Sequence, residues 1–597
     1  MEFQIPKNPA LKTNHKLLPA KQTCMNGCCF FCIMSDTDSS LRAARMYRLF
    51  KQMPLEDDQE HVLALSGLWK IALTQPNDPE FPSLGIFRCM AKLIEKGISD
   101  KDWLLRHQNV YFPYYAAHII GSYTMNKANF AHKAVKSHVV RPLMDLLEGK
   151  ISWVEQRVAL RALGHLAKHE ATFEAVAEHE GEIVEAAINI ASTCLKEVYD
   201  KFLSLNETRR LKYHRNLLTR GHGHLELENR KAEDWARQLQ CWSLCLLDCF
   251  ASKERSLRLI CKKQFLDGLC GMWGGMGNPG SPAGIGLVRT LCHTKVGRES
   301  IAESQEVVDS LCKVSRSSDD RQYSAIESLL QLLKDPLTRY KVIDTAAPVL
   351  VDLSELRSID GKIKGGQAIT QTLLQDYHKI KYCKMSLKSE IAERALKELW
   401  DLKVERVKRE SMMMSEEEIR EKEVLVGALK KEGNSVFWSG DIKGAMMKYS
   451  EALDLCPLKM WRKRIVLHSN RAQCHLLLRD ADAAISDTTR ALCLSSEAFP
   501  HSKSLWRRSQ AYDMKGITKE SLMDCLMFIN SRFESRHKQG LRIPCYAARM
   551  VNKHMNALGL CESAKSEMYV ECEGRKEHEG QNQIDIGEQS EGKNDGR

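Results

Sequence analysis

The fold of this 597-residue chain is decided by the stretch LKKEGNSVFWSGDIKGAMMKYSEALDLCP at 429–457. Two related stretches follow, LHSNRAQCHLLLRDADAAISDTTRAL at 467–492 and SKSLWRRSQAYDMKGITKESLMDCLMF at 502–528. In each, recurring residues, most of them small, stand where two antiparallel helices would approach closely, and in the first a proline stands where the second helix should end. These positions are Gly433, Ala445, Tyr449, Ala452 and Pro457, then Ala472, Ala484, Thr488 and Ala491, and last Ser509, Ser521, Cys525 and Phe528. The sequence therefore predicts three stacked helical hairpins with a continuous apolar core.

The offsets resemble those of the tetratricopeptide repeat (TPR). The resemblance implies a curved three-repeat domain over 416–560, which the helix expected in IPCYAARMVNKHMNALG would cap. The spacing is longer than the usual period of 34 residues, because Gly433 to Ala472 is 39 positions and Ala472 to Ser509 is 37. The extra residues fall in LCPLKMWRKRIV and LSSEAFPHS, where we expect longer loops or extended helix ends.

Five polar residues are expected on the concave side of this domain. In a TPR array the first helix of each hairpin lines that side, and residues four apart on a helix share one face. Lys430 and Asn434 form such a pair, Lys503 and Arg507 form another, and Asn470 lies between them. Three cations and two amides in one hollow suit a ligand that ends in several carboxylates, since charge-assisted hydrogen bonds are the stronger kind.

The same residues resemble the carboxylate clamp of TPR co-chaperones, which reads K-x-x-x-N, N-R-A and K-x-x-x-R. All three pieces are present here as KKEGN, NRA and KSLWR. The resemblance implies that the domain binds the acidic C-terminal tails of heat shock protein 90 or heat shock protein 70.

The region 38–380 alternates apolar helical segments with short polar turns. Its best-formed unit is HVVRPLMDLLEGKISWVEQRVALRALGHLAKHE at 138–170, in which Gly149 separates two apolar helical stripes. A short helix, a break and a longer helix that ends in LGHLA resemble the armadillo repeat. We therefore expect an armadillo-like α-solenoid of six to eight units before the TPR domain, in an all-α protein. Armadillo arrays bind peptides or protein surfaces, so the resemblance implies a second recognition surface for an unknown partner.

The remaining segments are expected to connect or extend these two domains. Residues 381–415 form a predicted helical linker, because no glycine or proline interrupts the sequence between Gln367 and Val426. Ser415 followed by Glu418 predicts a capping box at the start of the next helix. Residues 1–37 are irregular, and 561–597, rich in Glu, Gly, Lys and Gln, are expected to be disordered.

Composition narrows the function classes. A net charge of +11 over this length is compatible with acidic ligands and is well short of a nucleic-acid signature. The 21 cysteines are scattered through apolar segments and are typical of reduced core residues in an intracellular protein. No stretch is apolar enough for a membrane span, and the N-terminus lacks the pattern of a secretion signal. We expect a cytoplasmic protein, with access to the nucleus left open.

Three short motifs have weaker interpretations. In CMNGCCFFC, the thiols of Cys24, Cys28, Cys29 and Cys32 are candidates for zinc binding or reversible lipidation, but adjacent Cys28 and Cys29 suit one tetrahedral ion poorly, and an apolar element or free thiols is favoured. G-x-G-x-x-G at Gly275, Gly277 and Gly280 lacks a βαβ frame and indicates a loop between helices. HGHLE, with His222, His224 and Glu226, indicates a solvated loop rather than a metal site.

No catalytic motif of the common enzyme families occurs in the sequence, so a non-enzymatic role without a cofactor is expected. The leading interpretation is an adaptor or co-chaperone whose TPR domain binds a chaperone tail while the solenoid binds a client or scaffold. The chain resembles the armadillo and TPR proteins of plants over nearly its full length. It also shares its two domain types with the myosin chaperones, in which the TPR domain comes first. The alternative is an interaction scaffold in protein degradation or trafficking whose TPR domain binds another acidic peptide.

Overall fold

The protein is all-helical throughout the part of the chain that the computed structural model describes. The described residues are 29–206, 209–210, 212–219, 224–272, 283–317, 321–356, 365–382, 387–408, 410, 415–495, 499–534 and 543–558. No β-strand occurs within these ranges. The all-α prediction is confirmed.

The solenoid is built from the helices that precede residue 410. They are α1 (Phe30–Met34), α2 (Ser39–Gln52), α3 (Glu60–Thr74), α4 (Glu80–Ser83), α5 (Ile86–Ser99), α6 (Lys101–Leu105), α7 (Tyr111–Thr124), α8 (Ala128–Lys136), α9 (Val140–Leu147), α10 (Trp153–Lys168), α11 (Glu170–Ala177), α12 (Glu180–Val198), η1 (Tyr199–Leu203), α13 (Lys212–Thr219), α14 (Leu225–Ser252), α15 (Leu257–Ile260), α16 (Lys263–Leu269), α17 (Ala283–His293), α18 (Lys295–Glu303), α19 (Gln305–Ser315), α20 (Arg321–Lys334), α21 (Pro336–Val351), α22 (Gly365–Leu374), α23 (Tyr377–Tyr382), α24 (Glu390–Trp400) and η3 (Asp401–Arg406).

The unit α8–α9–α10 shows how the sequence specifies one repeat. Gly149 takes a left-handed φ of +80° after α9, a conformation that glycine adopts without strain. Ser152 then caps α10 by accepting a hydrogen bond from the Val154 amide. Val158 and Leu163 on the inner face of α10 are buried. The predicted break and both predicted stripes are therefore present.

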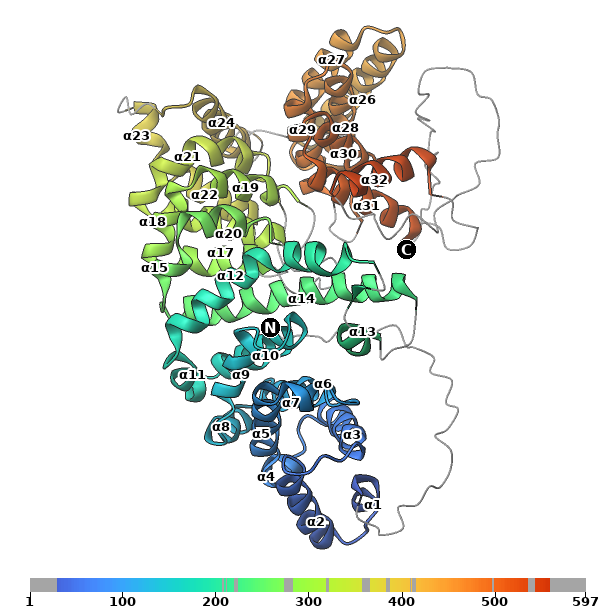
Figure 1. Ribbon diagram of the computed structural model, residues 1–597. Helices are drawn as coiled ribbons and strands as arrows, with labels where there is room; N and C mark the ends of the chain where they lie inside the picture. The colour runs from blue at the N-terminus through green and yellow to red at the C-terminus, as the bar shows by residue number, and fades with distance from the viewer. Residues whose placement is uncertain are drawn as a thin grey trace, which may run out of the picture.

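The longest helices of successive units lie side by side. In Figure 1 the stack rises from α3 and α7 through α10, α14 and α17 to α20, and each packs against the next. One continuous apolar core runs along this stack, from Phe30 to Leu399. Because every unit shares its core with its neighbours, the solenoid is a single elongated body.

The TPR region follows as three hairpins and a last helix. They are α26 (Glu416–Trp438) with α27 (Ile442–Leu455), α28 (Trp461–Leu477) with α29 (Ala481–Leu494), α30 (Ser502–Met514) with α31 (Thr518–Glu534), and α32 (Cys545–Ala557). Ser415 and Glu418 form the capping box at the start of α26. Helix α32 packs against α31 at the end of the stack.

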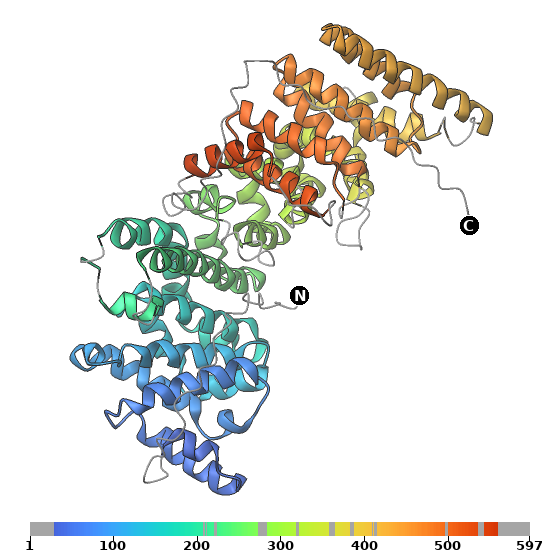
Figure 2. The same cartoon turned by 90° about the vertical axis from the view of Figure 1, so that its right-hand side faces the viewer.

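The unusually long first repeat has a structural explanation. Helix α28 begins at Trp461, so much of the added sequence extends this helix at its N-terminus. Figure 2 shows the TPR hairpins lying along the C-terminal part of the solenoid. Cys493 of α29 is buried within the core of the solenoid, so the two repeat regions are packed together.

Helix α24, which falls within the predicted linker 381–415, packs against α21 of the solenoid. Its residues Leu396 and Leu399 are fully buried in the solenoid core. This helix therefore closes the end of the solenoid next to the TPR hairpins. The five domain limits stay a prediction, and the segments 1–28 and 559–597 lie outside the described residues.

Candidate functional site

A hollow of about 500 Å³ lies among the three hairpins of the TPR region. The first helix of each hairpin contributes polar groups to it: Asn434 from α26, Asn470 and Gln473 from α28, and Arg507 from α30. An apolar wall completes the lining with Phe437, Trp438, Leu476, Leu477, Met514 and Met550. This combination of a few polar donors and apolar surface is typical of a ligand-binding pocket.

The structure brings three of the five predicted residues into the hollow. Asn434, Asn470 and Arg507 line it directly. Lys430 and Lys503 are not among its lining residues, but each lies one turn before a lining residue on the same helix, α26 or α30. Lys503 is exposed and Lys430 is partly exposed. Long lysine side chains at these positions are suited to a ligand that extends beyond the hollow.

Hydrogen bonds orient the two amides. Tyr449 donates its hydroxyl hydrogen to Oδ1 of Asn434 at 2.7 Å, and Nδ2 of Asn470 donates to the same oxygen at 3.4 Å. The side-chain oxygen of Asn434 is thus occupied as an acceptor. Its amide nitrogen, a donor, is the end that suits a ligand carboxylate.

Arg507 is a buried cation without a counter-charge among the described residues. It is only 5% exposed, and it donates from Nη1 to the Ser469 carbonyl at 2.7 Å and from Nε to Gln473 Oε1 at 3.0 Å. Burial lowers the pKa of its guanidinium to about 10, which still leaves it charged at neutral pH. No carboxylate among the described residues forms an ion pair with it, whereas its neighbour Arg508 is paired with Asp524 at 2.6 Å. A buried, uncompensated guanidinium is a ready anion site.

Close helix contacts hold the lining in place. A Cβ atom on Gly433 would lie 2.8 Å from the Tyr449 ring, so glycine is required for the approach that brings Tyr449 to Asn434. In the third hairpin, Ser509 and Ser521 each donate a hydroxyl hydrogen to the other's backbone carbonyl, at 2.9 and 2.8 Å. The small-residue positions in the sequence therefore mark real contacts between the paired helices.

Sequence reasoning missed the apolar wall and one more cation. Trp438 is 60% exposed at the end of α26 and lines the hollow together with Phe437. Arg479 also lines the hollow, from the turn after α28. The acid at the rim, Asp513, is neutralised by Lys553 at 2.6 Å. The available signal in the sequence was the position of Trp438, four residues after Asn434 on the same predicted helix.

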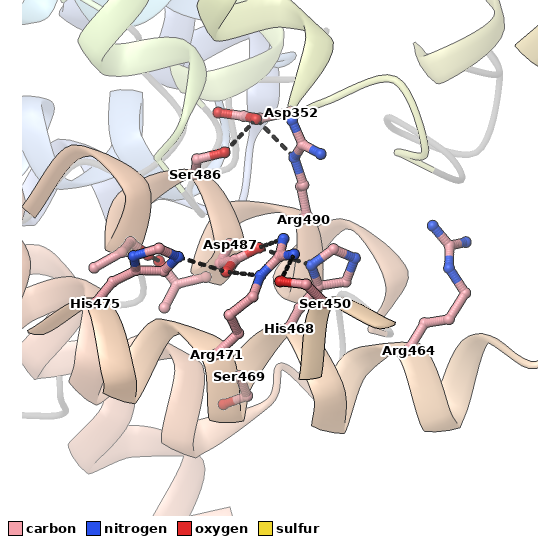
Figure 3. Close-up of polar contacts among 12 residues, drawn as sticks. Asp352, Ser450, Arg464, His468, Ser469, Arg471, His475, Ser486, Asp487 and Arg490 are labelled. Carbon is pink, nitrogen blue, oxygen red and sulfur yellow. Dashed lines mark hydrogen bonds and ion pairs between the residues drawn. The ribbon is translucent and has the colours of Figure 1, made fainter. Parts of the chain in front are cut away.

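The arginine of the N-R-A piece has a structural role. Arg471 donates through Nε and Nη2 to both carboxylate oxygens of Asp487, at 2.7 Å each, and His468 lies 2.9 Å from the same carboxylate (Figure 3). Burial alone would raise the pKa of Asp487, but the Arg471 charge and its hydrogen bonds hold it well below its usual range. This cluster fixes α28 on α29 within the second hairpin.

A second ionic cluster joins the TPR region to the solenoid. Asp352, at the end of α21, accepts hydrogen bonds from Arg490 Nε at 2.9 Å and Ser486 Oγ at 2.7 Å (Figure 3), and Arg316 of the solenoid contacts its other oxygen. Burial would raise the pKa of Asp352, but the charges of Arg490 and Arg316 outweigh it and lower the pKa. Arg490 also pairs with Glu398 of α24.

The N-terminal part of α28 contributes a further contact between the TPR region and the solenoid. Arg464 on that part donates from Nη1 to Oε1 of Glu355 at 2.7 Å, and its Nη2 contacts the other oxygen. Both side chains are largely buried. Lys403 lies 3.9 Å from Glu355 as well. The long repeat spacing thus places a guanidinium where it reaches the solenoid.

The other motifs add no site in the described part of the chain. Cys29 and Cys32 lie with their sulfurs 3.4 Å apart in α1 and the residue before it, while Cys24 and Cys28 lie outside the described residues. Within the described ranges no cluster of His, Cys, Asp or Glu is suited to hold a metal. Glu226 pairs with Arg230 one turn along α14. His222 and the loop with Gly275, Gly277 and Gly280 lie outside the described residues.

Comparisons with known proteins agree with both repeat types. A family model described as "Plant ARM repeat" matches residues 21–262, less than half of the chain. Protein unc-45 homolog B of Danio rerio is 33% identical over 88 residues, which are 15% of this chain and 9% of that protein. Tetratricopeptide repeat protein 12 of Homo sapiens is 41% identical over 73 residues, 12% of this chain and 10% of that protein. Sperm-associated antigen 1A of Danio rerio is 39% identical over 100 residues, 16% of this chain and 22% of that protein.

The fold and these similarities define a repeat protein of the armadillo and TPR type. The chain spans at most 22% of the length of these curated relatives, so the similarity concerns one repeat region rather than a whole protein. Repeat solenoids of this type are typically non-catalytic scaffolds for protein–protein interaction. Among the described helices, none has the length and apolar character needed to cross a membrane.

Proposed function

We propose that the protein is a non-enzymatic, cytoplasmic adaptor or co-chaperone whose TPR hollow binds the acidic C-terminal tail of heat shock protein 90 or heat shock protein 70. The solenoid would bind a client or scaffold protein at the same time. The observation that carries the proposal is Arg507, a buried guanidinium that lines the hollow and has no ion-pair partner among the described residues.

The chemistry of the lining supports this ligand class. A free C-terminus that is preceded by acidic side chains offers several carboxylates in a short segment. Arg507 would bind one of them through Nη2, because its Nε and Nη1 already donate to Gln473 and Ser469, and the amide donors of Asn434 and Asn470 would bind another. Lys430 and Lys503, outside the hollow, would meet the acidic side chains further along the tail. The apolar wall around Trp438 suits the aliphatic residue within a Glu-Glu-Val-Asp terminus.

Calorimetric titration tests the proposal with an acetylated peptide that ends in Glu-Glu-Val-Asp. Binding is expected with the free acid and should be lost when the terminal carboxyl is amidated. Asn434→Ala and Lys503→Ala should each weaken binding by about 10- to 150-fold, since a hydrogen bond to a charged group contributes about 1.5–3 kcal/mol. Lys443→Ala is the matched control, because Lys443 is an exposed lysine on α27, the second helix of its hairpin.

Absence of heat with the free-acid peptide would refute the chaperone assignment. Equal binding by the Lys503→Ala and Lys443→Ala proteins would refute the role of the predicted clamp.

The second candidate is an interaction scaffold whose TPR hollow binds a different acidic peptide. The observation in its favour is that Lys430 and Lys503 do not line the hollow, so the cations expected to meet a tail ending in several carboxylates are outside it. In that case a peptide with one acidic residue near its C-terminus would bind as tightly as the chaperone tail in the same titration.

A further inference from the structure

The solenoid carries a strip of arginine, aromatic and histidine side chains across four adjacent helices. Its members, which we call the arginine–aromatic strip, are Trp69 on α3, Tyr114 and His118 on α7, Arg157, Arg161 and His165 on α10, and Trp235 and Trp242 on α14. These helices pack side by side in the middle and lower parts of the stack in Figure 1. Trp69, Arg161, Trp235 and Trp242 are partly exposed, so the strip reaches the surface.

Arg157 lies at the centre of the strip and is held by neutral groups. Its guanidinium carbon is 4.0 Å from the centre of the Trp235 ring, a cation–π contact. It donates from Nη1 to Gln238 Oε1 at 2.7 Å and from Nη2 to the Tyr114 hydroxyl at 3.3 Å. Tyr114 stacks on the same indole, at 5.9 Å between ring centres. The Trp235 ring is therefore already engaged by protein groups.

Arg161 lies one turn further along α10 and donates from Nη1 to Nδ1 of His118 at 3.2 Å. A guanidinium can only donate, so Nδ1 must be the unprotonated nitrogen, and His118 is neutral with its proton on Nε2. Burial, together with the charges of Arg157 and Arg161, keeps the pKa of His118 well below its usual value. Burial lowers the pKa of Arg161 to about 10, so this arginine remains charged at neutral pH.

Neither arginine forms an ion pair with a described carboxylate. Asp234 lies nearby and accepts a hydrogen bond from Gln238, which in turn accepts from Arg157. Glu155 is bound to Tyr213 at 2.6 Å, and burial raises its pKa to about 7, so only part of its charge is present at neutral pH. The two guanidiniums therefore face at most one fully ionised acid.

Other buried or partly buried arginines of the solenoid do form ion pairs with described carboxylates. Arg210 pairs with Glu228, Arg298 with Asp335 and Arg339 with Asp376.

The strip also contains buried polar atoms that make no hydrogen bond to a described residue. Arg157 Nε, His165 Nε2 and Trp69 Nε1 are buried, and none has a hydrogen-bond partner in the described structure. Arg157 and His165 are 6% and 8% exposed, and each such unpaired polar atom is costly to bury.

We infer that the arginine–aromatic strip binds an extended acidic segment of a partner protein, with carboxylates at alternate positions. Arg157 and Arg161 are four residues apart on a helix, which places them about 6 Å apart along its axis. Alternate side chains on an extended peptide share one face at about 6.6 Å, so two such carboxylates match the two guanidiniums. The partly exposed rings of Trp69 and Trp242 flank the pair and would cover the apolar groups of the segment.

A labelled peptide tests this inference on the full-length chain. The probe is a fluorescein-labelled peptide with three glutamates alternating with leucines, whose C-terminus is amidated so that the TPR hollow has no terminal carboxylate to bind. Binding is followed by fluorescence anisotropy. Arg161→Gln and Arg157→Gln should each weaken binding by about tenfold or more, and binding should weaken as salt is added. Arg88→Gln, which removes the same charge from an exposed position on α5, should leave binding unchanged.

Four outcomes would overturn the inference. The first is that the glutamate peptide does not bind, and the second is that the same peptide with glutamine in place of glutamate binds equally well. The third is that the Arg88→Gln and Arg161→Gln proteins lose the same amount of peptide affinity. The fourth is that the protein binds a single-stranded oligonucleotide and not the peptide. Arg161 is partly exposed, so Arg161→Gln keeps the test valid if the buried Arg157→Gln protein fails to fold. Circular dichroism melting curves identify that failure.

Discussion

Replacing Glu355 by glutamine should release the TPR region from the solenoid. Glu355 accepts from both Nη atoms of Arg464, and the two side chains are only 15% and 5% exposed. The substitution keeps the shape but leaves Arg464 as a buried charge without its carboxylate. Removing one partner of a buried ion pair costs about 3–5 kcal/mol. At about 1.4 kcal/mol for each factor of ten, the ratio of docked to undocked protein should fall by about 10²- to 10⁴-fold.

Small-angle X-ray scattering measures this change directly, because undocking increases the radius of gyration. Calorimetry should also show the TPR transition at a lower temperature, separate from that of the solenoid. Replacing both members, Glu355→Gln with Arg464→Met, should recover much of the loss, since no buried charge is then left unpaired. Glu95→Gln, an exposed position on α5, is the control. An unchanged radius and unchanged melting in Glu355→Gln, or a double variant worse than the sum of the singles, would refute this account of the interface.

Three further predictions concern packing and charge. Gly433→Ala should destabilise the TPR region by about 1–3 kcal/mol and weaken tail binding, because the added Cβ would press on the Tyr449 ring. Thermal unfolding measures the loss of stability, and the calorimetric titration measures the loss of binding. The pKa values of Asp352 and Glu355 are lowered in the folded protein. The stabilisation that these two carboxylates contribute is therefore complete above their pKa values in the unfolded chain, near pH 4, and is lost as the pH falls below those values. Scattering at pH 7 and pH 3 should show undocking only at pH 3. Arg339→Met should lower the solenoid's stability by about 3 kcal/mol in urea unfolding, because this buried guanidinium donates to three backbone carbonyls at the ends of α20 and α22.

The hairpin architecture was predictable because small residues recur at contacts that each repeat must make. Gly433 and Ala472, read from the sequence as close-approach positions, are buried where paired helices meet. The armadillo unit at 138–170 was predictable for the same reason, since Gly149 breaks two apolar stripes. Local spacing therefore specifies which helices form and which faces they bury.

Contacts between the repeat regions could not be predicted in this way. Glu355 and Arg464 are 109 positions apart, and nothing in the periodicity of either repeat pairs them. The site was predictable in part. The i, i+4 rule placed Asn434 and Arg507 on the inner helix faces, but it could not show that Arg507 lacks an acidic neighbour or that Trp438 remains exposed. Those properties depend on side chains from other helices.

The cluster around Asp352 has a consequence for synthesis on the ribosome. Its partner Arg490 lies 138 positions later in the chain. At about 5–20 residues per second, roughly 7–28 s pass between the synthesis of Asp352 and the synthesis of Arg490. Arg316, which is translated 36 positions before Asp352, is present throughout this interval. Arg316 can therefore balance the charge of Asp352 before the TPR hairpins emerge, and the carboxylate is then already in place as a docking point for Arg490.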